Sequence, residues 1–296
     1  MKKLLKSAAL IALAIASPGF AQTSAKLPDA DPAMWVVKDA DTTIYLFGTV
    51  HALDGKRDWF NDEVKTAYDA SKEVVFEILI PEAATVQATV MKLAKNEGGK
   101  GLSTMLTAEQ AKKLGAELAS VGAPVTAFDQ FEPWFAATQL AQIRFMKKGI
   151  KPEHGVEAKL REAALKDGKT LGEVESFEWQ MNLFDGLPKE LQLAMITGYL
   201  DELEKGDEMM DKMMTSWAAG DIDTLSGIMN EALSKSPELS KLLLADRNAR
   251  WADWIQKRLE KPGAVFMAVG AGHLGGKDSV QDYLAKKGLK AVRVKS

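Results

Sequence analysis

The stretch Thr42–His51, TTIYLFGTVH, decides how the chain is organised. Its apolar run from Ile44 to Phe47 predicts a buried strand that ends at Gly48, and a histidine follows three residues later. The chain has only three histidines, and a second one, His273, ends the same pattern in VFMAVGAGHLGG. Because glycine permits a tight exit from a strand, we expect both histidines just beyond strand ends, where α/β proteins place their sites.

Residues 1–21 have the pattern of a secretory signal peptide. A basic start is followed by the apolar stretch Ala8–Ala16, by Ser-Pro-Gly, and by small residues that predict cleavage after Ala21. The apolar stretch is well short of the roughly 20 residues that span a bilayer. We therefore expect an exported protein without a membrane span, in the periplasm of a Gram-negative bacterium, with a flexible lead over residues 22–33.

Composition narrows the classes of partner and of chemistry. Loss of residues 1–21 removes three lysines and no acid, so the formal charge changes from −3 to −6. An acidic chain without a long basic run argues against nucleic acid as a partner. The chain has no cysteine, which excludes disulfides, thiol catalysis and thiolate metal ligands.

The order of the expected elements predicts an α/β (α+β) fold. A hairpin over residues 34–49, a helix over 59–72 and a strand over 73–80 stand at one end of the chain, and a strand, a helix and a closing strand over 264–295 stand at the other. Between them, about 81–260 has helical spacing, with one short strand near residues 169–176. We expect a mixed central sheet built from the N- and C-terminal segments, with a large helical insert, in a single domain over 34–296.

A lone carboxylate adds a third candidate for the site. Glu77 interrupts EVVFEILI, which otherwise reads as a buried strand, and a buried glutamate is costly unless it is paired or coordinated. The alternative is that Glu77 faces solvent or stands at the strand end. Two histidines and a carboxylate are typical of hydrolytic or oxygenase metal sites with open positions.

Four other patterns have simpler explanations. The methionines of MMDKMM, residues 209–214, share a helix face and are expected in the core rather than as Cu(I) ligands. His154 is expected at the surface. GAGHLG, residues 270–275, matches a dinucleotide-binding pattern, but the chain ends before a further βαβ unit. The tryptophans of amphipathic helices are expected in the core: Trp179, Trp217, Trp251 and Trp254.

The segments WVVKDADTTIYLFGTVH…VVFEI and RNARWADWI…GAVFMAVGAGHLGG resemble the TraB/GumN family, which is related to the Tiki-type metalloproteases. The resemblance covers nearly all of the mature chain. The family's two G-x-x-H motifs and intervening glutamate correspond to Gly48/His51, Gly270/His273 and Glu77. Further family positions correspond to Glu157 (where the family often has Asp), Glu175, Gln180, Arg247 and Asn248.

The resemblance implies a Tiki-like fold and metal-dependent peptidase chemistry with Mn or Co, or with Zn. His51 and His273 are the expected metal ligands, and Glu77 is expected to complete the ligand set or to act as general base on a metal-bound water. Glu175 is expected as an acid/base group or as the partner of a ligating histidine. Arg247 is expected to hold a carboxylate, either that of Glu175 or a substrate's C-terminus. Supporting roles are expected for Gly48, Gly270, Glu157 and Asn248.

Two other functions remain open at this point. One is a non-enzymatic protein that binds a small ligand, a peptide or haem in the same cleft. The other is a metal-independent, esterase-like hydrolase with a histidine base and a glutamate partner. The sequence leaves the substrate and the oligomeric state open.

Overall fold

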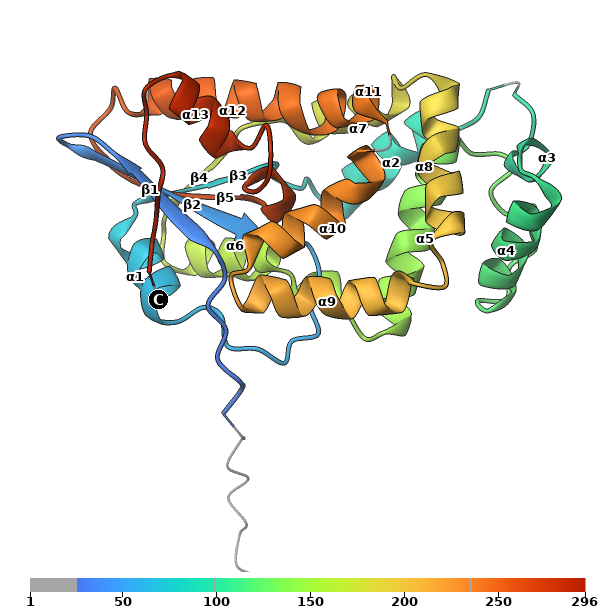
Figure 1. Ribbon diagram of the computed structural model, residues 1–296, viewed down its shortest axis with the longest axis horizontal. Helices are drawn as coiled ribbons and strands as arrows, with labels where there is room; N and C mark the ends of the chain where they lie inside the picture. The colour runs from blue at the N-terminus through green and yellow to red at the C-terminus, as the bar shows by residue number, and fades with distance from the viewer. Residues whose placement is uncertain (1–25, 98, 235, 296) are drawn as a thin grey trace, which may run out of the picture.

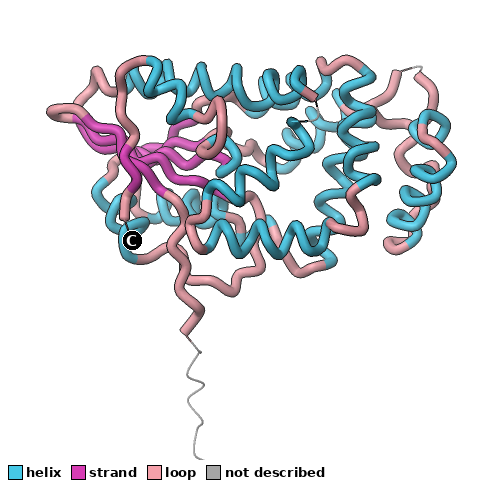
Figure 2. The backbone as a smooth tube through the Cα atoms, viewed as in Figure 1, coloured by secondary structure: helices cyan, strands magenta, loops and turns pink. Residues whose placement is uncertain are grey.

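The structure is a computed structural model that describes residues 26–97, 99–234 and 236–295. The predicted signal peptide therefore lies outside the described residues. The predicted α/β fold is confirmed: helices surround a mixed six-stranded sheet with the order β4-β3-β5-β2-β1-β6. Figures 1 and 2 show the sheet at one end of the molecule and a group of helices at the other.

The sheet combines strands from the two ends of the chain with one from the middle. β2 pairs with β5 in parallel, β5 with β3 in parallel, and β3 with β4 in parallel. The carboxyl ends of these four strands consequently meet at one edge of the sheet, which is the usual place for a site in this fold class. The strands are β1 (Met34–Lys38), β2 (Thr42–Thr49), β3 (Glu73–Phe76), β4 (Thr170–Glu173), β5 (Gly263–Gly270) and β6 (Val292–Arg293).

The predicted hairpin is confirmed by β1 and β2, which are antiparallel. The Asp39 carboxylate accepts hydrogen bonds from the backbone N–H groups of Asp41 (3.1 Å) and Thr42 (2.8 Å), and this bonding closes the turn. The closing segment of the chain adds β6, which pairs antiparallel with β1. The N-terminal hairpin is thus held between the two C-terminal strands β5 and β6.

Helices cover both faces of the sheet because the central strands are apolar on both sides. Along β5, Phe266 and Ala268 enter one core, while Val265, Met267 and Val269 enter the other. The first face carries α1 (Asp62–Ala70), α6 (Val156–Lys166), α9 (Gly206–Ala218) and α10 (Ile222–Ser234), and the second carries α12 (Asp246–Arg258) and α13 (Val280–Lys286).

The methionine cluster contributes to the core with two of its four members, whereas Met209 and Met213 are half-buried. Met210 and Met214 of α9 are buried beside Trp217 under the first face. Trp251 of α12 is buried under the second face. Trp179 differs from the expectation, since 38% of it is exposed.

The helical insert builds a core of its own away from the sheet. Leu114, Trp134, Leu140 and Ile196 are among its buried residues, and Figure 1 shows α3 and α4 at the end farthest from the strands. The remaining helices are α2 (Ala83–Leu93), α3 (Leu102–Met105), α4 (Ala108–Ala119), α5 (Pro133–Lys147), α7 (Phe177–Asp185), α8 (Lys189–Asp201) and α11 (Pro237–Ser240), with short turns η1 (Pro152–His154), η2 (Lys241–Ala245, a π-helix) and η3 (Ala271–His273).

Two further observations concern the predicted flexible lead and the possibility of a membrane-spanning helix. Within the predicted lead, Ala30 is buried and its N–H donates to the Asp58 carbonyl at 3.0 Å. Across the described ranges, we find no helix with the length and apolar character that crossing a membrane requires.

Candidate functional site

The predicted site residues leave the sheet at its carboxyl edge. Thr49 and Gly270 are register partners at the ends of β2 and β5, so His51 and His273 follow adjacent parallel strands. Glu77 directly follows β3, and Glu175 stands two residues beyond β4. The Glu175 N–H donates to the Glu77 carbonyl at 3.0 Å, which continues the pairing of these two strands past their ends.

Arg247 of α12 joins the two glutamates in a buried cluster. Its Nε lies 3.0 and 3.1 Å from the two Glu175 oxygens, and its Nη2 lies 2.7 Å from Glu175 Oε2 and also donates to Glu77 Oε1. Gln180 Nε2 adds bonds to Glu77 (2.5 Å) and Glu175 (3.2 Å). All four side chains belong to buried residues, so the guanidinium holds two carboxylates that water does not solvate.

Arg247 is the group that keeps Glu77 ionised at neutral pH. Burial by itself raises the pKa of Glu77, but the positive charges of protonated His273 and of Arg247 outweigh it and lower that pKa to about 2. Burial also lowers the pKa of His273 to about 3, so near neutrality the cations that act on Glu77 are Arg247, which is hydrogen-bonded to it, and His51, whose effect is smaller. The Gly270 N–H donates to the other Glu77 oxygen at 3.2 Å. This contact explains why the glycine of the second motif lies so close to the carboxylate.

His273 is a buried, neutral histidine with a defined tautomer. Asn248 Nδ2 donates to the Asp278 carbonyl at 2.8 Å, so its Oδ1 faces His273 Nδ1 at 2.6 Å and accepts the ring proton. The other nitrogen, Nε2, lies 3.2 Å from Arg247 Nη1, which only donates. A neutral ring with its proton on Nδ1 and a lone pair on Nε2 agrees with the lowered pKa of His273.

His51 is in the opposite situation. Its side chain is 76% exposed, and its Nδ1 lies 2.7 Å from Glu157 Oε1 at the start of α6. Thr49 Oγ1 donates to the same carboxylate oxygen at 2.5 Å. The negative charge of Glu157 raises the pKa of His51 to about 9, although water screens part of this attraction. Burial raises the pKa of Glu157, and the His51 charge outweighs it and lowers that pKa.

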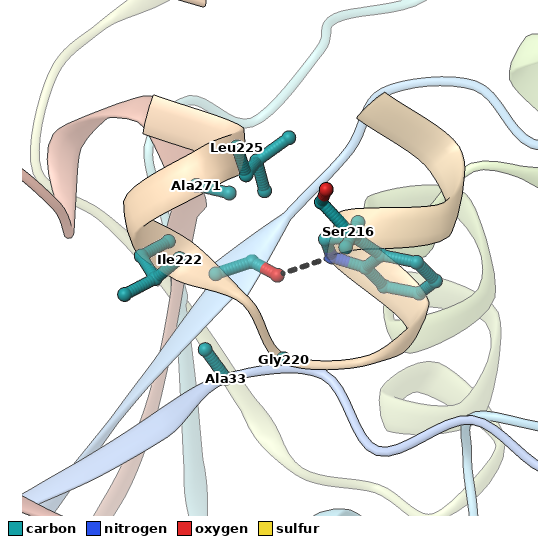
Figure 3. Close-up of a pocket in the computed structure, with 8 residues that line it drawn as sticks. Ala33, Ser216, Gly220, Ile222, Leu225 and Ala271 are labelled. Atoms are coloured by element: carbon teal, nitrogen blue, oxygen red, sulfur yellow. Dashed lines mark hydrogen bonds between the residues drawn. The ribbon is translucent and has the colours of Figure 1, made fainter. Parts of the chain in front are cut away.

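The backbone beneath His51 is held from two sides. Trp217 Nε1 donates to the Gly48 carbonyl at 2.9 Å, the dashed line in Figure 3, above a small apolar hollow that Ala33, Ile222, Leu225 and Ala271 help to line. On the other side, a Cβ placed on Gly155 would lie 2.2 Å from the His51 carbonyl oxygen. The loop of His51 therefore packs against backbone that tolerates no side chain at Gly155.

The residue types match the expected metal site, but the structure does not bring their ligand atoms together. Among the described residues, the sole set of three or more His or acidic ligand atoms mutually within 4.8 Å is Asp29, Asp31 and Asp62, so His51, Glu77 and His273 do not form one. Both Glu77 oxygens and His273 Nε2 accept from neighbouring donors. In this arrangement the Arg247 guanidinium takes the place of a metal cation beside the carboxylates.

Two members of the site were not predicted for it. Trp251, expected as a core residue, donates from Nε1 to Glu175 Oε1 at 3.0 Å, and its ring lies 4.4 Å from the His273 ring. Its spacing of four residues from Arg247 on one helix face is the signal that points to it. Thr49 was missed because a threonine within a strand has no distinguishing pattern.

Comparisons with known proteins agree with the resemblance. A family model described as the TraB/PrgY/gumN family matches residues 33–293, and the chain belongs to that family. "Uncharacterized protein YbaP" of Escherichia coli (strain K12) is 26% identical over 185 residues, covering 62% of this chain and 68% of the relative. An "Uncharacterized protein" of Treponema pallidum (strain Nichols) is 21% identical over 272 residues, covering 86% of this chain and 80% of the relative. No solved structure matches the chain significantly.

Proposed function

We propose that this member of the TraB/PrgY/gumN family is a hydrolase that cleaves a peptide or ester bond at the carboxyl edge of the sheet. The observation that carries the proposal is the pairing of an exposed imidazole with a carboxylate, His51 Nδ1 with Glu157 Oε1 at 2.7 Å. Within the described part of the chain, His51 Nε2 has no hydrogen-bond partner. A histidine held by a carboxylate at one nitrogen and free at the other is suited to proton transfer.

The neighbouring groups divide the work in this proposal. His51 Nε2 accepts a proton from the attacking water and returns it to the leaving group. Glu157 orients the ring and stabilises its protonated form, which the pKa near 9 reflects. The Arg247 cluster keeps the strand ends in place and does not take part in proton transfer. Because only neutral His51 acts as a base, the rate rises with pH towards about 9.

A metal-dependent hydrolase, with a divalent ion on His51, His273 and Glu77, is the second candidate for the same site. It is supported by the donor types and by their common position at the carboxyl edge. It requires Arg247 to release both His273 Nε2 and Glu77 before an ion binds.

The test is an activity screen of the whole protein with N-acetylated peptide pools and p-nitrophenyl esters. We expect His51→Gln to lose at least about 10²-fold of the rate, as removal of a general base does, and Glu157→Gln to lose part of it. His154→Gln, at the histidine that lies outside the cluster, is the matched control and is expected to keep wild-type activity.

Three other outcomes count against the proposal when the screen is combined with EDTA treatment, metal analysis and a peptide-binding assay. Loss of activity with EDTA, together with about one equivalent of bound metal in the wild type and none in His273→Gln, points to the second candidate. Equal activity in the wild type and His51→Gln removes His51 from the chemistry. Peptide binding without any turnover in the wild type identifies a binding protein instead.

We further propose that the protein acts in the periplasm after export. The support is the signal-peptide pattern of residues 1–21, with its basic start, short apolar stretch and small residues before Ala21. N-terminal sequencing of protein from the periplasmic fraction of a Gram-negative host is expected to begin at Gln22. Recovery of only the uncleaved chain from the cytoplasm contradicts the proposal.

A further inference from the structure

We propose that Arg250, stacked on Trp179 at the edge of the site, binds a carboxylate of the substrate, an assignment that rests on the proposed hydrolase function. The Arg250 guanidinium carbon lies 4.5 Å from the centre of the Trp179 ring. The Arg250 side chain is 48% exposed and Trp179 is 38% exposed. An exposed aromatic–guanidinium pair is therefore available to a ligand next to the buried cluster.

Arg247, the residue expected from the sequence to hold a substrate carboxylate, is not available for that task. It is 6% exposed, and its three nitrogens donate to Glu175, Glu77 and the Leu243 carbonyl, with Nη1 also facing His273. A substrate carboxylate that reached Arg247 would have to displace one of two buried glutamates. Breaking such a buried pair is strongly unfavourable.

Arg250 has N–H groups free to bind a ligand, whereas those of Arg247 are occupied. It stands three residues later on α12, and its nearest ion-pair partner is Glu175 Oε1 at 3.6 Å, beyond the length of a hydrogen bond. Within the described ranges, no hydrogen bond from Arg250 to another residue is found. Stacking covers the face of a guanidinium and leaves the N–H groups of its edge directed outward, where they match the two oxygens of a carboxylate.

Arg250 is not needed to satisfy Glu175. Glu175 Oε1 already accepts from Arg247 Nε and Trp251 Nε1, both at 3.0 Å, and Oε2 accepts from Arg247 Nη2 and Gln180. The contact with Glu175 still matters, because it places Arg250 directly beside a member of the buried cluster at the strand ends. A carboxylate bound there would lie at the same edge of the sheet as His51, separated from it by the ends of β3 and β5, so a peptide lying along this edge could reach both.

The chemistry recognised is a carboxylate, which a peptide supplies either at its C-terminus or on an acidic side chain. The probes are therefore three pools of N-acetylated hexapeptides: free acids without Asp or Glu, the same peptides as C-terminal amides, and amides with one Glu. Hydrolysis is followed by mass spectrometry, and binding is measured separately with the His51→Gln protein, in which turnover is suppressed.

The variants distinguish loss of a carboxylate-binding guanidinium from mere loss of a positive charge. Arg250→Gln removes the guanidinium, whereas Arg250→Lys keeps the charge beside Glu175 and removes the planar fork. Lys257→Gln is the matched control, since it removes an exposed positive charge from the same helix. Trp179→Leu removes the stacking surface. Thermal unfolding of each variant checks that the fold is kept, and Arg250→Lys carries the test if Arg250→Gln does not fold.

The expected result is that Arg250→Gln raises the Kd and KM of carboxylate-bearing peptides about tenfold or more, as loss of a charged hydrogen-bonding partner does. The amides without Glu stay unchanged, as does Lys257→Gln with every pool. Arg250→Lys and Trp179→Leu give intermediate losses. The pool that responds identifies the source of the carboxylate as the C-terminus or a side chain.

Two results overturn the inference, and they are distinct from failure of the proposed function. If the wild type hydrolyses all three pools alike, or if Arg250→Gln changes the hydrolysis of none of them, the inference is wrong and the hydrolase stands. If no pool is hydrolysed but carboxylate peptides bind and Arg250→Gln abolishes binding, the carboxylate site stands and the hydrolase is wrong. If no pool is hydrolysed and none binds, both are wrong.

Discussion

The ends of β2 and β5 carry the same sequence motif in two opposite environments. His51 is 76% exposed at the side chain, and Glu157 raises its pKa to about 9. His273 is 7% exposed, and burial lowers its pKa to about 3. At neutral pH one imidazole is therefore positively charged and the other is neutral. The motif determines where a histidine leaves the sheet, whereas its neighbours determine what the histidine can do.

The partners of the two histidines explain this difference. His51 faces one carboxylate and solvent, so its charged form is favoured. His273 lies between Arg247, a cation, and Asn248, a neutral acceptor, and is buried. A proton on His273 Nε2 would face the guanidinium. In the proposed hydrolase, His51 at the end of β2 (the β2 side) serves proton transfer, and His273 at the end of β5 with the Arg247 cluster (the β5 side) holds the strand ends in place.

The largest effect is expected from removing the cation on the β5 side. Arg247→Leu leaves the buried Glu77 and Glu175 without the cation that bridges them, which costs about 3–5 kcal/mol in free energy of unfolding. Urea denaturation measures it. Arg258→Leu breaks the less buried pair with Glu73 and serves as the control, with a clearly smaller loss expected. Equal losses in the two variants would contradict the central place of Arg247.

The pH dependence of stability should separate the two histidines. The pKa of His273 is about 3 when folded and 6.5 when unfolded, so its contribution is present above pH 6.5 and is lost as the pH falls towards 3. The pKa of His51 is about 9 when folded, so its contribution is present below pH 6.5 and is lost as the pH rises through 9.

Urea titrations between pH 3 and 10 measure this difference. His273→Gln is expected to remove part of the wild-type loss of stability on the acidic side, on the order of a few kcal/mol. His51→Gln is expected to leave the acidic side unchanged and to alter only the alkaline side. If His273→Gln altered only the alkaline side and His51→Gln only the acidic side, the environments assigned to the two histidines would be wrong.

A substitution at Gly155 tests the position of the His51 loop without changing a side chain of the site. Gly155→Ala places a methyl group 2.2 Å from the His51 carbonyl oxygen, which forces the loop to move and costs about 1–3 kcal/mol. Gly198→Ala in α8 is the matched control, because a Cβ there meets nothing within 4 Å. We expect loss of hydrolysis in Gly155→Ala alone. Unchanged activity would mean that the position of His51 is not critical.

The smallest effect on stability is expected from Glu157→Gln. Loss of the negative charge should lower the pKa of His51 from about 9 towards 6.5, which an NMR titration of the imidazole measures. The free energy of unfolding should change by less than about 1 kcal/mol, because the His51 side chain is largely exposed and water screens the pair. A His51 pKa that stays near 9 would show that another group raises it.

The sequence predicted that the candidate residues leave the sheet at the carboxyl ends of its strands, where the structure has them, because the end of a parallel strand can be recognised in the sequence. An apolar run that ends in glycine marks the exit of β2 and of β5. The strand expected over residues 73–80 instead ends at Phe76, so Glu77 stands just beyond β3 and not inside it. The hairpin, the short strand β4 and the closing strand were predicted for the same reason. The separation of the helical core from the sheet was not, since periodicity shows which face of a helix is apolar and not which element covers it.

Three features of the site lay beyond the sequence. The exposure of Trp179 was not expected, and neither was the bond from Trp251 to Glu175, because an amphipathic position does not reveal what faces a side chain. The sequence also provided no means of telling that Arg247 would be saturated and Arg250, three residues later, free. That difference depends on which residue points at the ends of β3 and β4.

The amino-acid sequence by itself determined the α/β class, the family and the group of side chains that leave the sheet at one edge. These properties follow from local patterns: runs of apolar residues, the glycines that end them and the polar residues that come next. Only the tertiary structure decided which histidine is charged, which arginine is buried and which carboxylate each one meets. The physical reason is that burial and the distance between charges, which set the pKa values and the pairing, depend on residues far apart along the chain, such as Arg247 and Glu77, which are separated by 170 positions.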